Sequence, residues 1–276
     1  MKKKTKVLFV SQEISPYMEP NQMSTICRQL PQGMQERGKE IRVFMPRFGC
    51  INERRNQLHE VIRLSGMNLI INDTDHPLII KVASIQAARM QVYFIDNEEF
   101  FQRKTILTDK KGLLHKDNDE RSMFFCRGVL ETVKKLGWAP DVIHCHGWFT
   151  HLIPFFMKTI FKDDPVFANT KVVLSLYDEE FKDTLDPGFG KKLKTGTISD
   201  EQVKPYAEPN FLNLHKAAIN LADGIILGSE NINAEMLKFI DKSNKPLLAY
   251  QSKEEYQNAY SKFYDEIVEE APVMAE

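Results

Sequence analysis

Short apolar runs alternate with longer stretches of helical periodicity along most of the chain. The runs have strand length, and they cover residues 7–11, 41–45, 142–144, 172–176 and 224–227. Between the first two, Met23, Cys27, Leu30 and Met34 recur at helical spacing, and Gly38 follows where a helix C-cap is expected. This alternation predicts a doubly wound α/β domain, with a mostly parallel sheet covered on both faces.

The pattern changes between residues 57 and 92, where shorter runs predict a β-hairpin insertion. The predicted strands cover residues 61–64, 69–71, 78–82 and 91–95. A long helix is then expected over residues 118–136, ended by Gly137. Residues 178–209 lack sustained periodicity and carry turn-forming residues, so they predict a long surface loop.

The end of the chain carries one more amphipathic segment. We expect residues 1–240 to form the α/β domain, residues 241–251 a linker and residues 269–276 a flexible tail. Between them, residues 252–268 predict a helix packed back on the domain. Its apolar stripe consists of Tyr256, Tyr260, Phe263, Tyr264 and Ile267.

Composition argues against two classes of partner. A hydrophobic share of 42% over 276 residues supports a packed core, and a formal net charge of −1 gives no basic surface for nucleic acid. No segment has the ~18 consecutive apolar residues of a membrane span. The apolar run after the basic residues 2–6 is too short for a signal peptide. We therefore expect a cytoplasmic protein with neither nucleic-acid nor membrane partners.

Histidines and cysteines give little support for a metal site. The four cysteines lie far apart and form no Cys-x-x-Cys pair. His144 and His146 share one face of a strand end and His151 follows, but no thiol or carboxylate stands at matching ligand spacing. We expect no metal and no cofactor. Ligands bind at the carboxyl ends of strands in open α/β sheets, which favours a substrate contact for His146 and leaves a structural role open for His144.

Several acidic residues have a simple structural interpretation. Asp117 and Asp119 flank the start of the predicted helix 118–136, where helix capping is a simpler role than binding a metal–nucleotide complex. Glu179 and Glu180 are expected to be solvated charges in the long loop. None of these residues is therefore placed in a predicted site.

An ordered set of segments resembles the bacterial glycogen and starch synthases. The segments cover residues 6–17, 30–31, 38–49, 117–121, 140–148, 213–214, 216–219 and 222–225, with further matches at Phe124, Phe125, Arg127, Ser229 and Glu235. The resemblance extends over about residues 5–240, and such an ordered set is far more specific than a lone motif.

The resemblance implies a fold and an activity. The family's enzymes have two lobes, and they transfer glucose from ADP-glucose to the end of an α-1,4-glucan, with retention of configuration and without a metal. By resemblance, this chain is the Rossmann-like first lobe alone. The second lobe, which supplies the acidic residues of the catalytic region, is expected to be missing. Residues 252–268 resemble the family's last helix, which crosses back onto the first lobe.

The resemblance also indicates substrate-binding residues, although it assigns no catalytic residue. They are Glu13, Tyr17, His146, Trp148, Tyr177 and Asp178. Tyrosine and tryptophan rings can stack on sugar faces. Core packing is the competing interpretation, and for Trp148 the two interpretations stand even.

One loop departs strongly from the family's pattern. Glu19, Pro20, Asn21 and Gln22 stand where the family has Lys-Thr-Gly-Gly after the first strand. Such a loop brings backbone N–H groups and an ammonium against a diphosphate, and therefore needs glycine and positive charge. Reversed charge and added side chains argue against diphosphate binding here, and so against ADP-glucose as a ligand.

Two further departures fall at the ends of strands. The family's His-Asp-Trp-His segment keeps its first histidine and its tryptophan, but Gly147 and Phe149 replace the other two residues. Tyr177 and Asp178 replace a His-Asn pair. In the family these positions line the glucosyl site, so the polar lining of that site is changed in this chain.

Two hypotheses about function follow. In the first, the chain is a non-catalytic homologue that binds α-1,4-glucan, a maltooligosaccharide or a synthase-type partner. In the second, it is a glucosyltransferase component that acts alone or with a separately encoded second lobe. The face on which a second lobe would sit is expected to be exposed, which suggests self-association into a homo-oligomer.

Overall fold

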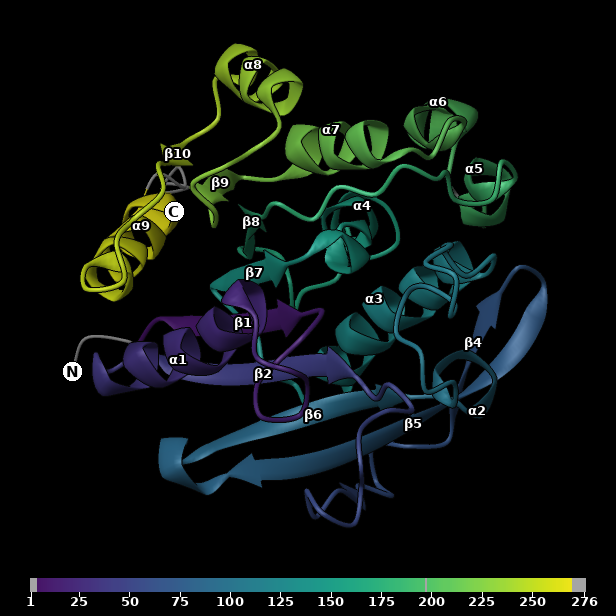
Figure 1. Ribbon diagram of the computed structural model, residues 1–276, viewed down its shortest axis with the longest axis horizontal. Helices are drawn as coiled ribbons and strands as arrows, with labels where there is room; N and C mark the ends of the chain where they lie inside the picture. Colours follow the sequence, from purple (N-terminus) through teal and green to yellow (C-terminus); the bar gives the residue numbers. More distant parts are fainter. Residues whose placement is uncertain (1–3, 197, 270–276) are drawn as a thin grey trace.

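The computed structural model describes residues 4–196 and 198–269. In these residues the strands form one mixed sheet in the order β10-β9-β8-β7-β1-β2-β6-β5-β3, and β4 pairs with β5 outside this path (Figure 1). The strands are β1 (Lys6–Ser11), β2 (Glu40–Pro46), β3 (His59–Glu60), β4 (Met67–Ile71), β5 (Thr74–Ile85), β6 (Met90–Asp96), β7 (Val142–His146), β8 (Lys171–Leu176), β9 (Gly224–Leu227) and β10 (Leu247–Leu248).

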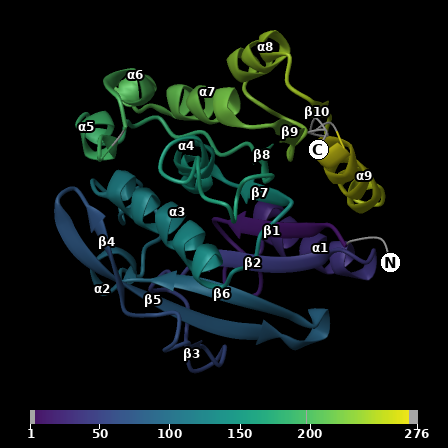
Figure 2. The same cartoon turned by 180° about the vertical axis from the view of Figure 1, so that it is seen from behind.

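Helices cover both faces of this sheet (Figures 1 and 2). The α-helices are α1 (Gln22–Glu36), α2 (Glu98–Phe101), α3 (Asn118–Lys135), α4 (Leu152–Lys158), α5 (Phe189–Leu193), α6 (Asp200–Val203), α7 (Phe211–Leu221), α8 (Ala234–Ser243) and α9 (Tyr256–Glu269). Short 3₁₀ helices are η1 (Gln86–Ala88), η2 (Trp148–Thr150) and η3 (Lys204–Tyr206). No helix in the described ranges is both long and apolar enough to cross a membrane.

The strands from β10 to β6 along the sheet are all parallel, with β1 near the middle. The side chains of Val7, Leu8, Phe9 and Val10 are all buried, because α1 and α9 lie on one face and α3 and α4 on the other (Figures 1 and 2). Strands covered on both faces are apolar on both faces. The α/β fold predicted from the sequence is therefore confirmed.

The insertion differs in detail from the prediction. Strand β6 pairs in parallel with β2 as well as antiparallel with β5, so it belongs to the main sheet. Residues 61–64 form a turn and not a strand, because the Leu64 amide donates to the Val61 carbonyl at 2.9 Å. Leu64 is buried in that turn, whereas Ile62 is 83% exposed. An apolar run in a turn was mistaken for a strand.

Residues 178–209 are more ordered than the predicted surface loop. They contain α5, α6 and η3, and their apolar side chains pack into the main core. The buried members are Leu185, Phe189, Leu193, Ile198, Val203 and Tyr206. The prediction was wrong because elements of three to five residues are too short to show a periodicity.

The C-terminal part joins the domain at two points. In the range expected as a linker, residues 241–251, α8 continues to Ser243 and β10 pairs in parallel with β9. Helix α9 then packs beside α1 (Figure 1), and Asp265 accepts a 2.5 Å hydrogen bond from Lys39 Nζ. Residues 270–276, most of the expected flexible tail, lie outside the described residues.

Candidate functional site

The first turn of α1 is the clearest feature at the carboxyl edge of the sheet. Asn21 is its N-cap: Oδ1 accepts the Ser24 amide at 2.7 Å, and the Ser24 hydroxyl accepts the Asn21 amide at 2.9 Å. Ser24 Oγ also donates to the Glu19 carbonyl at 3.1 Å. This capping box satisfies donors that a bound anion would otherwise take.

An acidic side chain lies against that cap. Glu13 Oε2 accepts a 2.6 Å hydrogen bond from Asn21 Nδ2, and Glu13 Oε1 accepts a 3.4 Å bond from Gln12 Nε2. The loop after β1 therefore places a carboxylate beside the N-terminus of α1. In this position it repels a phosphate and complements the positive end of the helix.

A chain of hydrogen bonds ties α1 to the ends of β8 and β9. Gln22 Nε2 donates to the Gly228 carbonyl at 3.0 Å, and Gln22 Oε1 accepts from the Ser229 hydroxyl at 2.8 Å. Ser229 Oγ in turn accepts the Asp178 amide at 3.3 Å. Gln22 and Asp178, two sequence-predicted site residues, are thus brought together through Ser229.

Gly147 has a conformational reason to replace a larger residue. Its φ of +86° lies in the left-handed region, and a Cβ added there would lie 2.8 Å from the Cβ of Gln12. The Gln12 side chain lies against Gly147, and its Oε1 accepts a hydrogen bond from the Phe149 amide at 3.2 Å. A side chain at this position, such as the family's aspartate, would therefore clash with Gln12 in the turn between β7 and η2.

A cleft of about 860 Å³ opens beside this turn of α1. Its lining residues are Glu13, Ser15, Pro16, Tyr17, Met18, Glu19, Pro20, Asn21, Cys50, Asn52, Arg55, Asn56 and Ile106. Tyr17 packs edge-on against Phe94, with ring centroids 4.9 Å apart. Burial raises the pKa of Tyr17 to about 12, and its hydroxyl has no hydrogen-bond partner among the described residues. Predicted residues therefore share one cavity, whose polar lining consists of side-chain amides, a serine hydroxyl, the Tyr17 phenol, the Cys50 thiol and the charged groups of Glu13, Glu19 and Arg55.

His146 and Tyr177 lie in the interior, below the edge. A 2.7 Å hydrogen bond joins His146 Nδ1 to the Tyr177 hydroxyl. His144 is held by Tyr264 of α9 at 2.6 Å and by Ser175 at 2.8 Å. Burial lowers the pKa of His146 to about 3 and that of His144 well below its ordinary value, so both rings are neutral near pH 7. His144 therefore has the structural role that the sequence analysis left open, because both of its ring nitrogens are hydrogen-bonded inside the protein.

Trp148 is also inside the protein. It is 5% exposed and packs on Phe149 and Phe181, with ring centroids 5.5 and 5.1 Å apart. Of the three aromatic residues singled out from the sequence, only Tyr17 lines the cleft; Trp148 and Tyr177 are covered by other side chains. Tyr17 is also largely buried, at 8% exposed, so it contributes only a small part of its surface to the cleft.

Glu179 is the functional candidate that sequence reasoning missed. Its Oε1 accepts the Trp148 amide at 2.8 Å, while its Oε2 is buried and has no hydrogen-bond partner in the described part of the chain. Burial, with a smaller contribution from Glu13, raises the pKa of Glu179 to about 8. The prediction of a solvated loop charge was wrong, because it took residues 178–209 as a surface loop.

The acidic start of α3 also differs from its predicted role. Asp117 is the N-cap residue by position, but its side chain makes no capping bond and pairs with Arg103. Asp119 is buried and pairs with Lys192 at 2.7 Å. Over residues 4–196 and 198–269, no group of three or more histidine, cysteine or acidic side chains is arranged to hold a metal ion.

Comparison with known structures shows that this fold matches the GT-B glycosyltransferase-like fold. The catalytic domain of starch synthase IV from Arabidopsis thaliana, bound to ADP and acarbose, superposes with a TM-score of 0.73 over 91% of this chain and 52% of that one. The two sequences are 16% identical, so this likeness concerns the fold.

Sequence comparison is more specific. The family described as "Starch synthase catalytic domain" matches residues 6–246. The glycogen synthase of Chlorobium limicola is 39% identical over 174 residues, which cover 63% of this chain and 36% of that protein. The glycogen synthase of Chlorobaculum parvum is 33% identical over 219 residues, covering 79% of this chain and 44% of that protein.

The chain belongs to the starch synthase catalytic domain family. The resemblance drawn from the sequence is thereby confirmed. The chain matches less than half the length of these curated relatives.

Proposed function

We propose that this protein binds α-1,4-glucan in cytoplasmic storage-polysaccharide metabolism without transferring glucose by itself. The proposal rests on family membership and on the residues at the carboxyl edge of the sheet. A synthase-type enzyme or a second copy of this chain is the protein partner that this proposal allows. The proposed ligand is the glucan, and we expect ADP-glucose not to bind.

The capped N-terminus of α1 is the observation that carries the proposal. The capping box satisfies the backbone amides of Asn21 and Ser24, and the Glu13 carboxylate lies 2.6 Å from the side-chain nitrogen of Asn21. A diphosphate at this position would meet Glu13 and Glu19 instead of an ammonium and glycines. Like-charge contacts of this kind cost several kcal/mol, enough to abolish useful affinity.

The cleft beside that cap has the composition that a glucan requires. Sugar hydroxyls are recognised by side chains that both donate and accept, such as Asn52 and Asn56, and by charged groups such as Arg55 and Glu13. Its volume of about 860 Å³ is in the range of clefts that hold small ligands. A neutral oligosaccharide fits this lining better than an anion.

Isothermal titration calorimetry with maltoheptaose and, separately, with ADP-glucose tests the proposal. We expect maltoheptaose to bind and ADP-glucose to give no heat of binding. Arg55→Ala should weaken maltoheptaose binding by about tenfold, the loss of roughly one good polar contact. Arg54→Ala is the matched control, because Arg54 is also exposed but does not line the cleft. ADP-glucose binding, or no maltoheptaose binding, contradicts the proposal.

Glu179 favours a second candidate function, a glucosyltransferase component. A buried carboxyl with a pKa of about 8 is typical of a group that exchanges protons near neutral pH. If this alternative holds, the purified protein, or a complex with a second-lobe partner, transfers glucose from ADP-glucose to maltoheptaose. Glu179→Gln then lowers that rate by at least tenfold. No turnover at saturating substrate and no copurifying partner would remove the alternative.

A further inference from the structure

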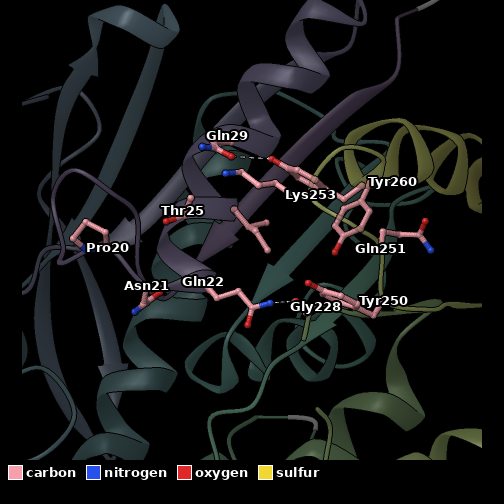
Figure 3. Close-up of a pocket in the computed structure, with 12 residues that line it drawn as sticks. Pro20, Asn21, Gln22, Thr25, Gln29, Gly228, Tyr250, Gln251, Lys253 and Tyr260 are labelled. Carbon is pink, nitrogen blue, oxygen red and sulfur yellow. Dashed lines mark hydrogen bonds between the residues drawn. The ribbon is translucent and has the colours of Figure 1, made fainter. Parts of the chain in front are cut away.

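A second cavity lies on the other side of the first turn of α1. It has a volume of about 360 Å³ and lies between α1, the end of β9 and the segment that leads into α9 (Figure 3). Its lining residues are Pro20, Asn21, Gln22, Thr25, Ile26, Gln29, Gly228, Tyr250, Gln251, Lys253, Tyr256 and Tyr260. Residues 250–260 thus supply much of its wall.

The lining combines tyrosine rings with side-chain amides. Figure 3 shows the hydroxyl ends of Tyr250 and Tyr260 facing the same space, with Gln22 on the opposite wall. Tyr250 is 40% exposed, so part of its ring is free to contact a ligand. Gln251 is partly exposed beside it. Rings that offer apolar faces, next to amides that both donate and accept, suit a sugar.

The charges of this cavity are few. Lys253 is the one charged side chain among the lining residues, and no carboxylate lines the cavity. The amide of Gln22 is already bonded to Gly228 and Ser229, and Asn21 caps the helix. A nucleoside diphosphate would therefore find one lysine and a helix terminus whose N-cap is already engaged, which is weak support for two phosphates.

The cavity and the cleft are neighbours. Both are lined by Pro20 and Asn21, so these two residues form a wall that the cleft shares with the cavity lined by Tyr250 and Gln251. The ridge between the two spaces is the short loop that replaces the family's diphosphate loop. Its proline and its capping asparagine give the ridge a fixed shape.

We propose that this cavity, defined as the Tyr250 pocket, binds glucosyl units of the same α-glucan chain that occupies the cleft. The inference rests on the proposed function and adds a second subsite to it, built by residues 250–260. A glucan long enough to cross the Pro20–Asn21 ridge contacts both spaces, whereas a short oligosaccharide occupies the cleft alone. Affinity therefore rises with chain length.

Calorimetry with maltotriose and maltoheptaose tests this subsite. Wild-type protein should bind maltoheptaose at least tenfold more tightly than maltotriose. Tyr250→Ala should weaken maltoheptaose binding about tenfold and leave maltotriose binding unchanged, which removes most of that difference in affinity. Gln251→Ala should also weaken maltoheptaose binding, but by a smaller factor. Gln91→Ala is the matched control, because Gln91 is exposed on β6 and lines neither space. Urea midpoints show that each variant is folded.

Each outcome separates this inference from the proposed function. Arg55→Ala should weaken binding of both sugars, because its side chain lines the cleft. If maltoheptaose binds but Tyr250→Ala changes neither sugar, or weakens both equally, the subsite inference is wrong and the proposed function stands. ADP-glucose binding that Tyr250→Ala abolishes would assign the pocket to a nucleotide and overturn the inference. If neither sugar binds, the proposed function fails first.

Discussion

Glu179 shows how strongly a single residue's chemistry depends on its surroundings. In the sequence it is one of two adjacent glutamates in a stretch without periodicity, where solvation is the ordinary expectation. In the structure its neighbour Glu180 is exposed, whereas the Glu179 carboxylate is buried against the backbone of Trp148. Burial disfavours the ionised form, and no local sequence signal reports burial that distant segments create.

Glu179→Gln should make stability less sensitive to alkaline pH. The carboxyl ionises near its ordinary pKa of 4.5 in the unfolded chain but near 8 in the folded protein, so its contribution to stability is full below pH 4.5 and is lost as pH rises to 8. Glutamine resembles the protonated acid and does not titrate. The stability difference in favour of the variant should grow by a few kcal/mol between pH 5 and pH 8.5.

Urea unfolding at several pH values measures this difference. Glu180→Gln is the matched control and should show no comparable change with pH, because Glu180 is exposed. A pH-independent difference for Glu179→Gln would mean that the carboxyl ionises normally in the folded protein.

At the scale of elements, the long periodic ones were predictable and the short ones were not. The ranges expected for β1, β2, β8, β9, α1 and α3 agree with the structure to within two residues at each end, since their apolar pattern is continuous. Helices α5 and α6 have five and four residues. Their positions come from tertiary contacts, which a local pattern does not encode.

One such contact is an ion-pair cluster that ties α5 to α3. Lys192 Nζ lies 2.7 Å from Asp119, 2.8 Å from Glu120 and 3.4 Å from Asp186. The Asp119 side chain is fully buried, and burial raises its pKa above the ordinary value despite the lysine. Removing the cation would leave a buried carboxylate without its counter-charge.

Lys192→Met should therefore destabilise the protein by about 3–5 kcal/mol, the usual cost of breaking a buried ion pair from one side. Lys191→Met is the matched control, because Lys191 is exposed and should cost less than about 0.5 kcal/mol. The double variant Asp119→Asn, Lys192→Met should recover part of the loss. Equal urea midpoints for the two single variants would show that the cluster contributes nothing.

At the scale of the whole molecule, four buried histidines make the fold sensitive to acid. Burial lowers the pKa of His146 to about 3, that of His215 to about 4, and those of His144 and His151 well below 6.5. At pH values between these lowered pKa values and 6.5, the four histidines are protonated in the unfolded chain but neutral in the folded protein. The stability that the neutral rings contribute is present above pH 6.5 and is lost as pH falls.

His146 and His215 should each cost about 2 kcal/mol at pH 5, and His144 and His151 act in the same direction. Glu179 opposes them with a gain of about 2–3 kcal/mol between pH 7 and pH 5. The sum predicts a net loss of several kcal/mol between pH 7 and pH 5. Urea unfolding monitored by circular dichroism at pH 5, 6 and 7 measures it. A free energy of unfolding that stays flat or rises toward pH 5 would contradict the prediction.

The candidate site was predictable in outline, through its position at the carboxyl ends of the strands and through the replaced loop. Glu13, Tyr17 and Asn21 do line one cleft. The Tyr250 pocket was not predictable, because β10 and α9 return to the first turn of α1 across more than two hundred residues of sequence. Only the fold brings these segments together.

The return of α9 along α1 has a practical consequence for handling the protein. Thr5 Oγ1 and Asp265 Oδ1 lie 3.5 Å apart, so the first and last described segments meet at the amino edge of the sheet (Figure 1). The cleft opens at the opposite edge, after the carboxyl end of β1. A support attached at Thr5 or Asp265 would therefore hold the protein by the edge of the sheet opposite to the cleft.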